Sequence, residues 1–408
     1  MRPISVPFVR SLGSLAAAAL TAACVAASPA ARAAVNARVF DRVWSLVDSR
    51  YYDPRAQGVD WAAAHAAFRP RALAAPDENA LYAVLTTMLQ PLNDDHAYVQ
   101  SPAEVRREAL GESARPLLGV RIVRRGTGYA VDDVRPGSPA DAAGVETGWI
   151  VESADGRPYD VGVVRVDGVP VSLVFRDVGG ATRTLTIAPR TASPGPERYP
   201  VRRVGDAYVL AFDNFDPGAA DWLYEQLRAV PDGAPLVVDL RGNGGGRIVE
   251  VERALGCFLP RGARVAEMRT RRGRPRVSTV LGACPAGVDG PVAVLVGRRS
   301  RSGAEMFAAA LQEAGRATVV GGRTAGALLS SLQYPLPDGG RLTLSEADFV
   351  TARGNRIERF GLPPDLAVEV TQADRRAGRD PALDAAVALV ARQAAARPLR
   401  SAGPETPE

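Results

Sequence analysis

A strand–turn–helix unit recurs through the second half of the chain. The apolar run Pro235–Leu240 is followed by a glycine-rich turn and a helix-forming segment near Ile248–Phe258. The run Pro291–Val296 is followed by a polar turn and the helix-forming segment Gly303–Ala314, and Ala317–Val320 begins the pattern again. Short continuous apolar runs are typical of strands buried on both faces, and their alternation with helices predicts parallel βαβ units. In such sheets functional groups gather at the carboxyl ends of the strands.

The 408 residues are 46% hydrophobic and 23% charged, an ordinary globular composition that excludes a disordered, collagen-like or disulfide-scaffold protein. A chain of this length forms two or three domains. The formal net charge is +5, but Arg alternates with Asp and Glu along most of the chain. We therefore expect no nucleic-acid partner.

All 50 basic residues are Arg, because the sequence contains no Lys. A Schiff-base lysine, a Walker A lysine and a Ser-Lys catalytic dyad are therefore excluded. The two histidines are His65 and His96, so a histidine-rich metal cage is excluded as well. We expect neither a metal nor a cofactor.

The first 33 residues have the pattern of an export signal. Arg2 and Arg10 form a positive region, Ser14–Ala27 is apolar and rich in Ala, and Ala31–Ala33 supplies the small residues of a cleavage site. We predict a signal peptide over residues 1–33, a mature start near Ala34, and an exported protein, periplasmic or secreted. No other segment approaches the roughly 18 apolar residues of a membrane span, so we expect no stable span after cleavage.

The three cysteines divide between the signal and the mature chain. A lipoprotein anchor at Cys24 is the weaker alternative, because Thr21 stands where a bulky residue is usual. Cys257 and Cys284 are 27 positions apart in the mature chain. A disulfide between them, in an oxidising compartment, would stabilise the fold by roughly 3 kcal/mol on the loop-entropy model. Two buried, unpaired cysteines are the alternative, and the residues do not decide between the two.

Three regions follow one another along the mature chain. Residues 34–112 carry apolar side chains at helical spacing and predict a helical module. Residues 116–190 change to short alternating strands with glycine-rich turns and predict a small β domain. Thr191–Pro200 is rich in Pro, Ser and Gly and is typical of a linker. The βαβ region then covers residues 200–396, and residues 397–408 form a tail.

Ser302 is the leading candidate for a nucleophile. It stands in the turn after an apolar run, directly before Gly303, at the start of a helix whose N–H groups and dipole favour a developing anion. The alternative is that Ser302 is only a helix N-cap, which from the local sequence is the commoner case. Ser300 is a less well-placed competitor.

Three arginines lie within four positions of this serine: Arg298, Arg299 and Arg301. Together they should make the site electropositive. Because a guanidinium group binds a carboxylate in bidentate geometry, we expect at least one of them, with Arg299 and Arg301 as candidates, to bind an acidic group of a substrate. A solvated surface position is the alternative for each.

A glycine loop, GNGGG, follows the run Pro235–Leu240. A phosphate cradle is rejected, because no Lys follows and the spacing is not GxGxxG. Glycines also allow backbone N–H groups to approach closely, as an oxyanion hole requires, so Gly245, Gly246 and Gly303 are candidates for that role. A plain tight turn is the alternative.

His96 is the candidate base. It follows Asp94 and Asp95 in a polar stretch, whereas His65 stands among alanines on a short helix and is expected to pack. Glu358 could orient the imidazole. A solvated glutamate paired with a neighbouring Arg is the alternative for Glu358.

In combination, these segments resemble the tail-specific, or C-terminal processing, serine peptidases and their tricorn-like relatives. The resemblance covers nearly the whole mature chain, in order, and lies in LNDDHAYV (Leu92–Val99), PLVVDLRGNGGG (Pro235–Gly246), SGAEMFAAAL (Ser302–Leu311), RATVVGG (Arg316–Gly322) and IERFGLPPD (Ile357–Asp365). Residues Leu118–Tyr159 resemble a PDZ domain. The implied fold is α/β and multidomain, with the helical module, a PDZ-like β domain and a crotonase-like βαβ peptidase core.

One departure decides the mechanism that the resemblance implies. Tail-specific members carry a lysine 25 positions after the serine, and here Ala327 stands at that position. The histidine-bearing, tricorn-like branch uses a serine, a histidine and a glutamate, which correspond to Ser302, His96 and Glu358. Asp95 stands where the tricorn pattern has a serine before its histidine.

The resemblance implies an exported serine endopeptidase that acts on proteins or peptides. In its PDZ-like domain, the loop around Leu118 and Gly119 would bind a chain terminus of the substrate. Two alternatives stay open: a non-catalytic homologue that binds peptides through the PDZ groove, and a carrier of apolar ligands. The sequence does not indicate the oligomeric state.

Overall fold

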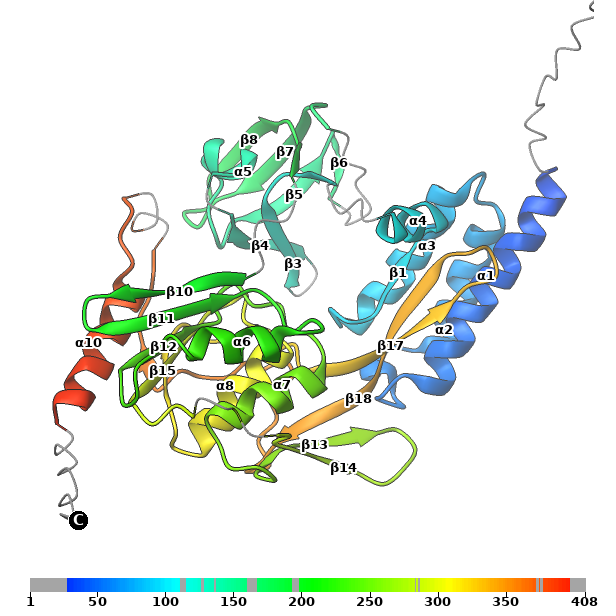
Figure 1. Ribbon diagram of the computed structural model, residues 1–408. Helices are drawn as coiled ribbons and strands as arrows, with labels where there is room; N and C mark the ends of the chain where they lie inside the picture. Colours follow the sequence, from blue (N-terminus) through cyan, green and yellow to red (C-terminus); the bar gives the residue numbers. More distant parts are fainter. Residues whose placement is uncertain are drawn as a thin grey trace, which may run out of the picture.

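The computed structural model describes residues 28–110, 115–125, 128–135, 137–159, 167–192, 198–282, 284, 287–371, 374 and 377–396. The expected signal stretch up to residue 27, Cys24 included, and the expected tail lie outside the described residues. The described chain forms a helical module, a small β domain and a larger α/β core (Figure 1).

The α/β core is built on a six-stranded sheet. Its strands, in spatial order, are β10 (Arg198–Val204), β11 (Ala207–Phe212), β12 (Leu236–Asp239), β15 (Val292–Val296), β16 (Thr318–Gly321) and β19 (Leu366–Ala367). β10 and β11 pair antiparallel, and each later pair in this order is parallel. The prediction of parallel βαβ units is therefore confirmed.

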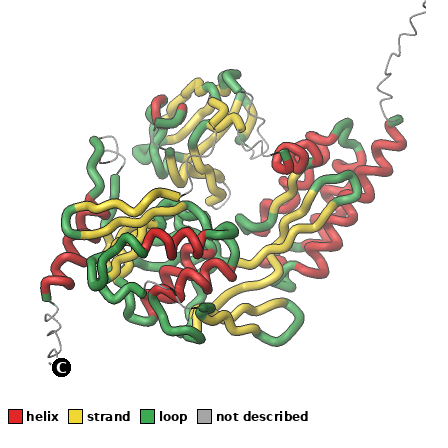
Figure 2. The backbone as a smooth tube through the Cα atoms, viewed as in Figure 1, coloured by secondary structure: helices red, strands yellow, loops and turns green. Residues whose placement is uncertain are grey.

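Helices cover both faces of this sheet, because alternate residues of a strand point to opposite sides. The helices are α6 (Ala219–Leu227), α7 (Ile248–Ala254), α8 (Gly303–Glu313) and α10 (Pro381–Ala395). Val238 and Val294 face the side where α6, α7 and α8 pack. Val237 and Leu295 face α10 on the other side. Figure 2 shows these helices in red around the yellow strands.

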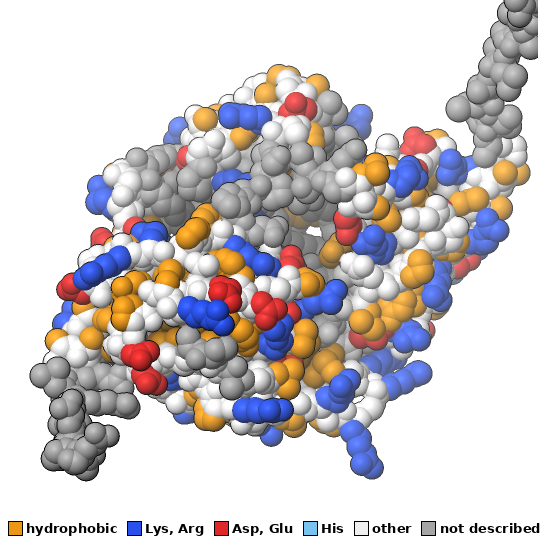
Figure 3. Space-filling view, viewed as in Figure 1, with side chains coloured by type: hydrophobic (Ala, Val, Ile, Leu, Met, Phe, Trp, Pro, Cys, Tyr) orange, Lys and Arg blue, Asp and Glu red, His pale blue; other side chains and the backbone are white. Residues whose placement is uncertain are grey.

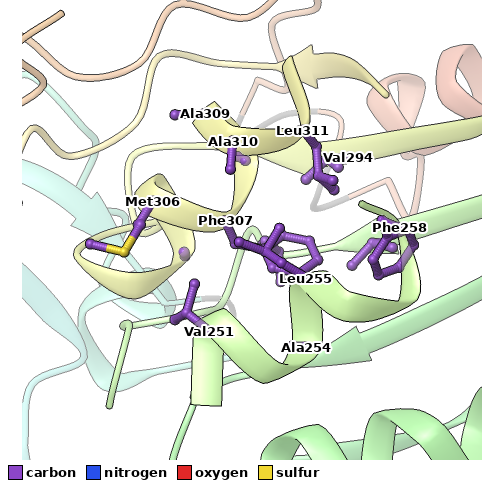
Figure 4. Packing of buried hydrophobic residues seen from close by; sticks show 14 of the residues in the cluster. Val251, Ala254, Leu255, Phe258, Val294, Met306, Phe307, Ala309, Ala310 and Leu311 are labelled. Carbon is purple, nitrogen blue, oxygen red and sulfur yellow. The ribbon is translucent and has the colours of Figure 1, made fainter. Parts of the chain in front are cut away.

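Aromatic and aliphatic side chains lock α7 and α8 together. Leu255 and Phe258 lie in and after the 3₁₀ turn Leu255–Cys257 that ends α7, and Figure 4 shows both beside Phe307 of α8. Phe307 is fully buried, and its ring centre lies 5.6 Å from those of Phe258 and Phe215. This packing fixes α8 on the sheet and so fixes the turn at its start.

The helical module has a core of its own. Its helices are α1 (Pro29–Arg50), α2 (Trp61–Leu73), α3 (Glu78–Leu89) and α4 (Pro102–Ala109), with 3₁₀ turns at Ala56–Gly58 and Gln90–Leu92. Apolar faces meet around Phe40 and Leu85, which are fully buried. Among the described residues, burial begins at Asn36, whose side-chain amide donates to the carbonyls of Ala72 and Ala75. A mature start near Ala34 would leave this packing intact.

One long strand, β18 (Arg341–Thr351), connects the helical module to the α/β core. Its sheet also contains β1 (Tyr98–Gln100), β13 (Arg264–Thr270), β14 (Arg276–Thr279) and β17 (Leu329–Pro335). Leu342 and Leu344 of β18 pack in the core of the helical module, whereas Phe349 packs in the α/β core. β1 begins two residues after His96 and pairs with Arg341–Thr343. The histidine is therefore anchored on a strand that also enters the core containing Ser302.

The small β domain is an antiparallel sheet with one short helix. Its elements are β3 (Val120–Arg125), β4 (Gly128–Val134), α5 (Pro139–Ala142), β5 (Ile150–Ala154), β6 (Arg157–Pro158), β7 (Val171–Arg176) and β8 (Thr182–Ile187). β2 (Arg115–Leu117) pairs with β9 (Arg190–Ala192) and closes the two ends of the domain. The strands agree with the β pattern expected for residues 116–190, and their identification as a PDZ domain stays a prediction.

The expected linker at Thr191–Pro200 is wrong at both ends. Its first residues belong to β9 and its last ones to β10. Pro200 is tolerated there because β10 lies at an edge of its sheet and its pairing is interrupted between Tyr199 and Arg202. Composition alone did not reveal that backbone pairing holds these segments.

The surface and the cysteines bear on two points that composition left open. On the face drawn in Figure 3, Arg and Asp or Glu side chains are interspersed rather than gathered by sign. Cys257 and Cys284 form a disulfide, which was one of the two alternatives.

Within the described part of the chain, no helix combines the length and the apolar content that a membrane crossing requires.

Phe307→Ala should lower the free energy of unfolding by about 3–5 kcal/mol, because it removes a buried ring and leaves a cavity between α7 and α8. Val249→Ala on α7 is the control, since Val249 is 44% exposed; it should change this free energy by less than about 0.5 kcal/mol. Urea unfolding followed by circular dichroism measures both. Equal effects of the two substitutions would contradict the packing of α8 described above.

Candidate active site

Ser302 lies in a sharp turn between β15 and α8. Its φ of 52° and ψ of −118° lie outside the regions that residues with a side chain ordinarily adopt. Its backbone N–H donates to the carbonyl of Ala327 at 2.9 Å and to Oε2 of Glu305 at 3.0 Å. Strained backbone of this kind persists only where the surroundings hold it, and it clusters at functional sites. The turn leaves Ser302 half-buried at the carboxyl end of a buried strand.

Ser300 has a structural role in the same turn. It is fully buried, and its hydroxyl donates to the carbonyl of Leu240 at 2.7 Å and accepts from the N–H of Gly297 at 3.0 Å. These bonds use the hydroxyl inside the turn. Ser302 is therefore the better placed of the two candidate nucleophiles.

Glu305 fixes the nucleophile turn from within the protein. It stands on the first turn of α8 and is fully buried. Its carboxylate accepts hydrogen bonds from the N–H groups of Ser302, Gly326 and Ala327, at 3.0, 2.7 and 2.9 Å, and from the Thr324 hydroxyl. Burial raises the pKa of Glu305 above its ordinary value, and these four bonds oppose the rise. A single side chain thus joins the nucleophile turn to the loop after β16.

The glycine loop after β12 packs directly against this turn. A Cβ on Gly245 would lie 2.6 Å from Ser302 Cβ and 2.8 Å from the nitrogen of Gly303, so the approach requires glycine. The N–H of Gly245 donates to Oδ1 of Asn243 at 2.9 Å. In the described structure no hydrogen bond uses the N–H of Gly246 or that of Gly303. Of the two expected alternatives, Gly246 rather than Gly245 therefore has an N–H available beside Gly303.

The loop that carries His96 is tied to the nucleophile turn. Asp95 forms an ion pair at 2.7 Å with Arg301, which directly precedes the candidate serine. Arg359, from the late segment, donates to the carbonyl of Leu92 in the same loop at 3.0 Å. These contacts bring histidine and serine to one region although they are 206 positions apart.

The imidazole of His96 is largely buried between charges of both signs. Burial and the positive charge of Arg301 lower the pKa of His96, and the carboxylates of Asp94 and Asp95 oppose this. The neutral form, which can accept a proton, is therefore favoured at neutral pH. Among the described residues no hydrogen bond joins His96 to Ser302 Oγ, and such bonds often tighten only when a substrate is bound.

Glu358 is buried, and none of its described contacts is to the imidazole. Its Oε2 accepts the N–H of Leu328 at 2.8 Å. Burial and the nearby Asp94 carboxylate raise the pKa of Glu358 to about 8. The carboxylate beside His96 is that of Asp94, whose Oδ1 lies 3.9 Å from Nδ1 and accepts the backbone N–H of His96 at 2.8 Å. The structure therefore brings a different carboxyl group to the histidine than the sequence suggested.

Ala327 lies at the nucleophile turn, as its correspondence to the family's lysine position implies. Its carbonyl accepts the N–H of Ser302, and its side chain is buried. The position that the resemblance assigns to the lysine thus carries only a methyl group.

Each arginine near the nucleophile is paired with an aspartate. The pairs are Arg298–Asp132 at 3.0 Å, Arg299–Asp133 at 3.9 Å and Arg301–Asp95 at 2.7 Å. Asp132 and Asp133 belong to β4 of the small β domain. A substrate carboxylate would have to displace one of these internal partners. In the structure the three pairs hold the β domain and the histidine loop against the nucleophile turn.

Leu118 and Gly119 form a turn packed against the start of α5. The carbonyl of Leu118 accepts the N–H of Ala140 at 2.9 Å. Gly119 has a φ of 78°, and a Cβ there would lie 2.0 Å from that of Ser138. The turn is therefore tightly held, and its use as a peptide site stays a prediction.

His65 packs, as expected. Its ring centre lies 4.8 Å from that of Trp44 and 5.5 Å from that of Phe40, and its Nε2 lies 3.7 Å from Oδ1 of Asp41. Its side chain is 36% exposed, so it packs at the surface of the helical module, on a different element from the histidine loop.

Two acidic residues of this region, Glu305 and Asp94, were not among the site residues expected from the sequence. Glu305 had a signal, because Ser302 and Glu305 have the Ser-x-x-Glu spacing of a capping box. For Asp94 the only signal in the sequence was its position two residues before His96. No group of three or more His, Cys, Asp or Glu side chains within the described ranges could hold a metal ion.

Residues 207–368 match the family model described as Peptidase family S41, and residues 33–90 match the Tricorn protease C1 domain. The S41 match includes the nucleophile turn and the glycine loop. The first three helices of the helical module coincide with the C1 match.

Similar proteins agree with these matches. The putative tricorn protease homolog 2 of Streptomyces coelicolor is 28% identical over 398 residues, which cover 86% of this chain and 32% of the relative. A probable CtpA-like serine protease of Staphylococcus aureus is 24% identical over 266 residues, covering 62% of this chain and 52% of the relative. The chain spans about a third of the length of the tricorn homologues that it matches.

Among solved structures, the photosystem II D1 C-terminal processing protease has the same fold. The two structures superpose with a TM-score of 0.61 at 22% sequence identity, over 82% of this chain and 93% of that one.

Glu305→Gln should lower the free energy of unfolding by about 1–3 kcal/mol, because the amide keeps one acceptor oxygen and turns an NH₂ group toward N–H donors. The amide protons of Gly326 and Ala327 should also exchange faster with solvent. Glu225→Gln is the control, since the Glu225 side chain is 63% exposed on α6. Urea unfolding and hydrogen exchange measure the two effects, and equal behaviour of both variants would contradict the anchoring role of Glu305.

Proposed function

We propose that the S41 domain makes this chain a serine endopeptidase that hydrolyses peptide bonds in proteins or peptides through Ser302 and His96. The observation that carries the proposal is the strained turn at Ser302, which packs against the glycine loop and lies beside the N–H groups of Gly303 and Gly246, neither of which forms a hydrogen bond in the described chain. A simple helix N-cap needs neither the strain nor the glycine contact. The protease names of the tricorn and CtpA-like relatives support the same class of reaction.

In the proposed reaction, Ser302 Oγ attacks the scissile carbonyl carbon while Nε2 of His96 takes the hydroxyl proton. The carbonyl oxygen becomes an oxyanion, which the N–H groups of Gly303 and Gly246 stabilise together with the dipole of α8. His96 then gives its proton to the leaving amine. A water molecule, deprotonated by His96, hydrolyses the acyl-enzyme and restores the serine.

Histidine is the base in this proposal because the site offers no amine. The chain contains no Lys, and Ala327 stands at the lysine position of the tail-specific members. The lowered pKa of His96 keeps its imidazole in the form that accepts a proton. Both facts support the histidine-bearing, tricorn-like branch.

One cavity in the described chain, of about 380 Å³, does not suit an apolar ligand. Its lining includes three arginines and two aspartates: Arg55, Arg269, Arg356, Asp53 and Asp348. A site for an apolar ligand is lined mainly by apolar side chains. A non-catalytic peptide-binding homologue is the other alternative, and labelling of the serine separates it from a peptidase.

We further propose that the chain is exported and that its β domain binds the C-terminal end of the substrate at the Leu118–Gly119 turn. The Cys257–Cys284 disulfide supports an oxidising compartment. The ion pairs of Arg298 and Arg299 with β4 provide a link from such a peptide site to the nucleophile turn.

Purified chain should hydrolyse unstructured protein substrates and react with a fluorophosphonate probe at Ser302. Ser302→Ala and His96→Ala should each lower kcat by a factor on the order of 10⁴, because the two groups act as a unit. The acidic limb of kcat/KM should lie below about pH 6.5, the ordinary pKa of histidine, because the pKa of His96 is lowered. His65→Gln is the control and should keep full activity. If the wild-type chain is neither labelled nor active, the peptidase proposal is wrong and the two non-catalytic alternatives, peptide binding and apolar-ligand carriage, remain. Activity of the His96→Ala variant would contradict the histidine mechanism.

Peptides with a free C-terminus should bind the Ser302→Ala chain about tenfold more tightly than the same peptides with an amidated C-terminus. A carboxylate held by backbone N–H groups forms charge-assisted hydrogen bonds, which the amide cannot replace. Fluorescence anisotropy on the full chain measures both affinities without cleavage. Equal affinities would contradict a terminus-binding role for the Leu118–Gly119 turn.

A further inference from the structure

We propose that Asp94, rather than Glu358, orients the imidazole of His96, and that Tyr51 supports Asp94 through its hydroxyl. The proposal rests on the serine-peptidase function and names two positioning residues for it. Neither residue touches the substrate, since both act through His96.

Eight buried side-chain polar atoms of the described residues have no hydrogen-bond partner, and three of them belong to this cluster: Tyr51 OH, Asp94 Oδ2 and His96 Nδ1. A buried polar group that stays unpaired destabilises the folded state. A tyrosine hydroxyl and a protonated Nδ1 are donors, and a carboxylate oxygen is an acceptor, so the three groups can satisfy one another. The distance of 3.9 Å from Nδ1 to Asp94 Oδ1 needs to shorten by about 1 Å to reach hydrogen-bond length.

Asp94 and Tyr51 are both firmly held in place. The Asp94 side chain is 2% exposed, and its Oδ1 already accepts the backbone N–H of His96 at 2.8 Å. Tyr51 caps the end of α1, where its N–H donates to the carbonyl of Val47 at 3.1 Å, and it is fully buried. Burial raises the pKa of Tyr51 and the Asp94 charge adds to the rise, so the hydroxyl keeps its proton. A carboxylate tied to the backbone of the histidine itself is well suited to hold the ring orientation.

Glu358 is a less suitable partner for the imidazole. Burial and the Asp94 carboxylate raise the pKa of Glu358 to about 8, so its neutral form is favoured at pH 7. A carboxyl group stabilises the imidazolium that forms when His96 takes the serine proton only in its charged form. The short distance from Asp94 to the ring and the raised pKa of Glu358 therefore both favour Asp94 in this role.

Other charged and titratable groups also face this cluster. They are Tyr52 after α1, Asp95 in the histidine loop, Arg301 in the nucleophile turn, and Arg356 and Asp348 near Glu358. Asp95 opposes Arg301 in its effect on His96. Asp95 is thus a neighbour with the same charge as Asp94, but it is paired with Arg301 and Arg121 instead of facing the imidazole nitrogen.

The proton movements balance without any further reactant. The Ser302 proton moves to Nε2 of His96, while Nδ1 keeps its own proton and donates it in a hydrogen bond to Asp94. Asp94 stays ionised throughout, and the Tyr51 hydroxyl donates to its second oxygen. On collapse of the tetrahedral intermediate, the Nε2 proton leaves with the amine.

Nitrogen NMR of the full chain with ¹⁵N-labelled histidine tests the assignment without requiring activity. The chain has two histidines, so His65→Gln leaves the signals of His96 alone. We expect neutral His96 to carry its proton on Nδ1. Asp94→Asn should shift the proton to Nε2 and lower the pKa further, whereas the matched control Asp95→Asn should lower the pKa and leave the tautomer unchanged. A proton on Nε2 in the wild-type chain, or a tautomer unaffected by Asp94→Asn, overturns the proposal.

Kinetics with a cleaved peptide supply the second readout. Asp94→Asn should lower kcat by about 10³–10⁴ and leave KM within a few-fold, as for a triad carboxylate. The kcat of Asp94→Glu should be at least tenfold higher than that of Asp94→Asn. Tyr51→Phe should lower kcat about tenfold, and Asp95→Asn should lower it less than tenfold.

The kcat of Glu358→Gln should be at least tenfold higher than that of Asp94→Asn. If Glu358→Gln instead has the lower kcat, the proposal is overturned. If no form of the chain cleaves peptides while the NMR result holds, the peptidase function fails and the placement of Asp94 stands.

Discussion

The site depends on the hydrogen bonds that the buried carboxylate of Glu305 accepts. Burying an acidic group is unfavourable unless hydrogen bonds compensate for the lost water, and here four donors from two segments do so. Because the donors belong to the nucleophile turn and to the loop after β16, neither segment can move without leaving unpaired groups behind. The positive φ of Ser302 and the contact of that turn with Gly245 are maintained by the same anchoring.

Backbone pairing and ion pairs connect the histidine loop and the small β domain to the nucleophile turn that Glu305 holds. β18 packs at one end in the helical module and at the other in the α/β core, so the strand that pairs beside the histidine loop also packs in the core that contains α8. The Arg–Asp pairs that add the β domain are partly exposed, and such pairs contribute up to about 1 kcal/mol each. They therefore set the orientation of the β domain more than they stabilise the fold.

Local patterns predicted the parts of the structure that depend on neighbouring residues. The β12 and β15 strands, the helix after Ser302 and the glycine loop were visible because apolar runs and turn residues follow one another directly. The pairing of Arg298 with Asp132 spans 166 positions and has no local signature. The choice between Asp94 and Glu358 likewise depends on which carboxyl the fold turns toward the ring, and the sequence carries no measure of that. Backbone pairing at the ends of Thr191–Pro200 overrode the composition of a linker for the same reason.

The shared strand β18 also determines when the site can exist. His96 is synthesised 206 residues before Ser302, and the strand that joins their two cores follows both of them. A nascent chain that has not yet extended past Arg359 lacks β18 or the contact that ties Leu92 to the late segment. In such a chain only the ion pairs of Arg298, Arg299 and Arg301 are left to hold the other parts against the nucleophile turn. The order of the elements along the chain therefore places the assembly of the site late in synthesis.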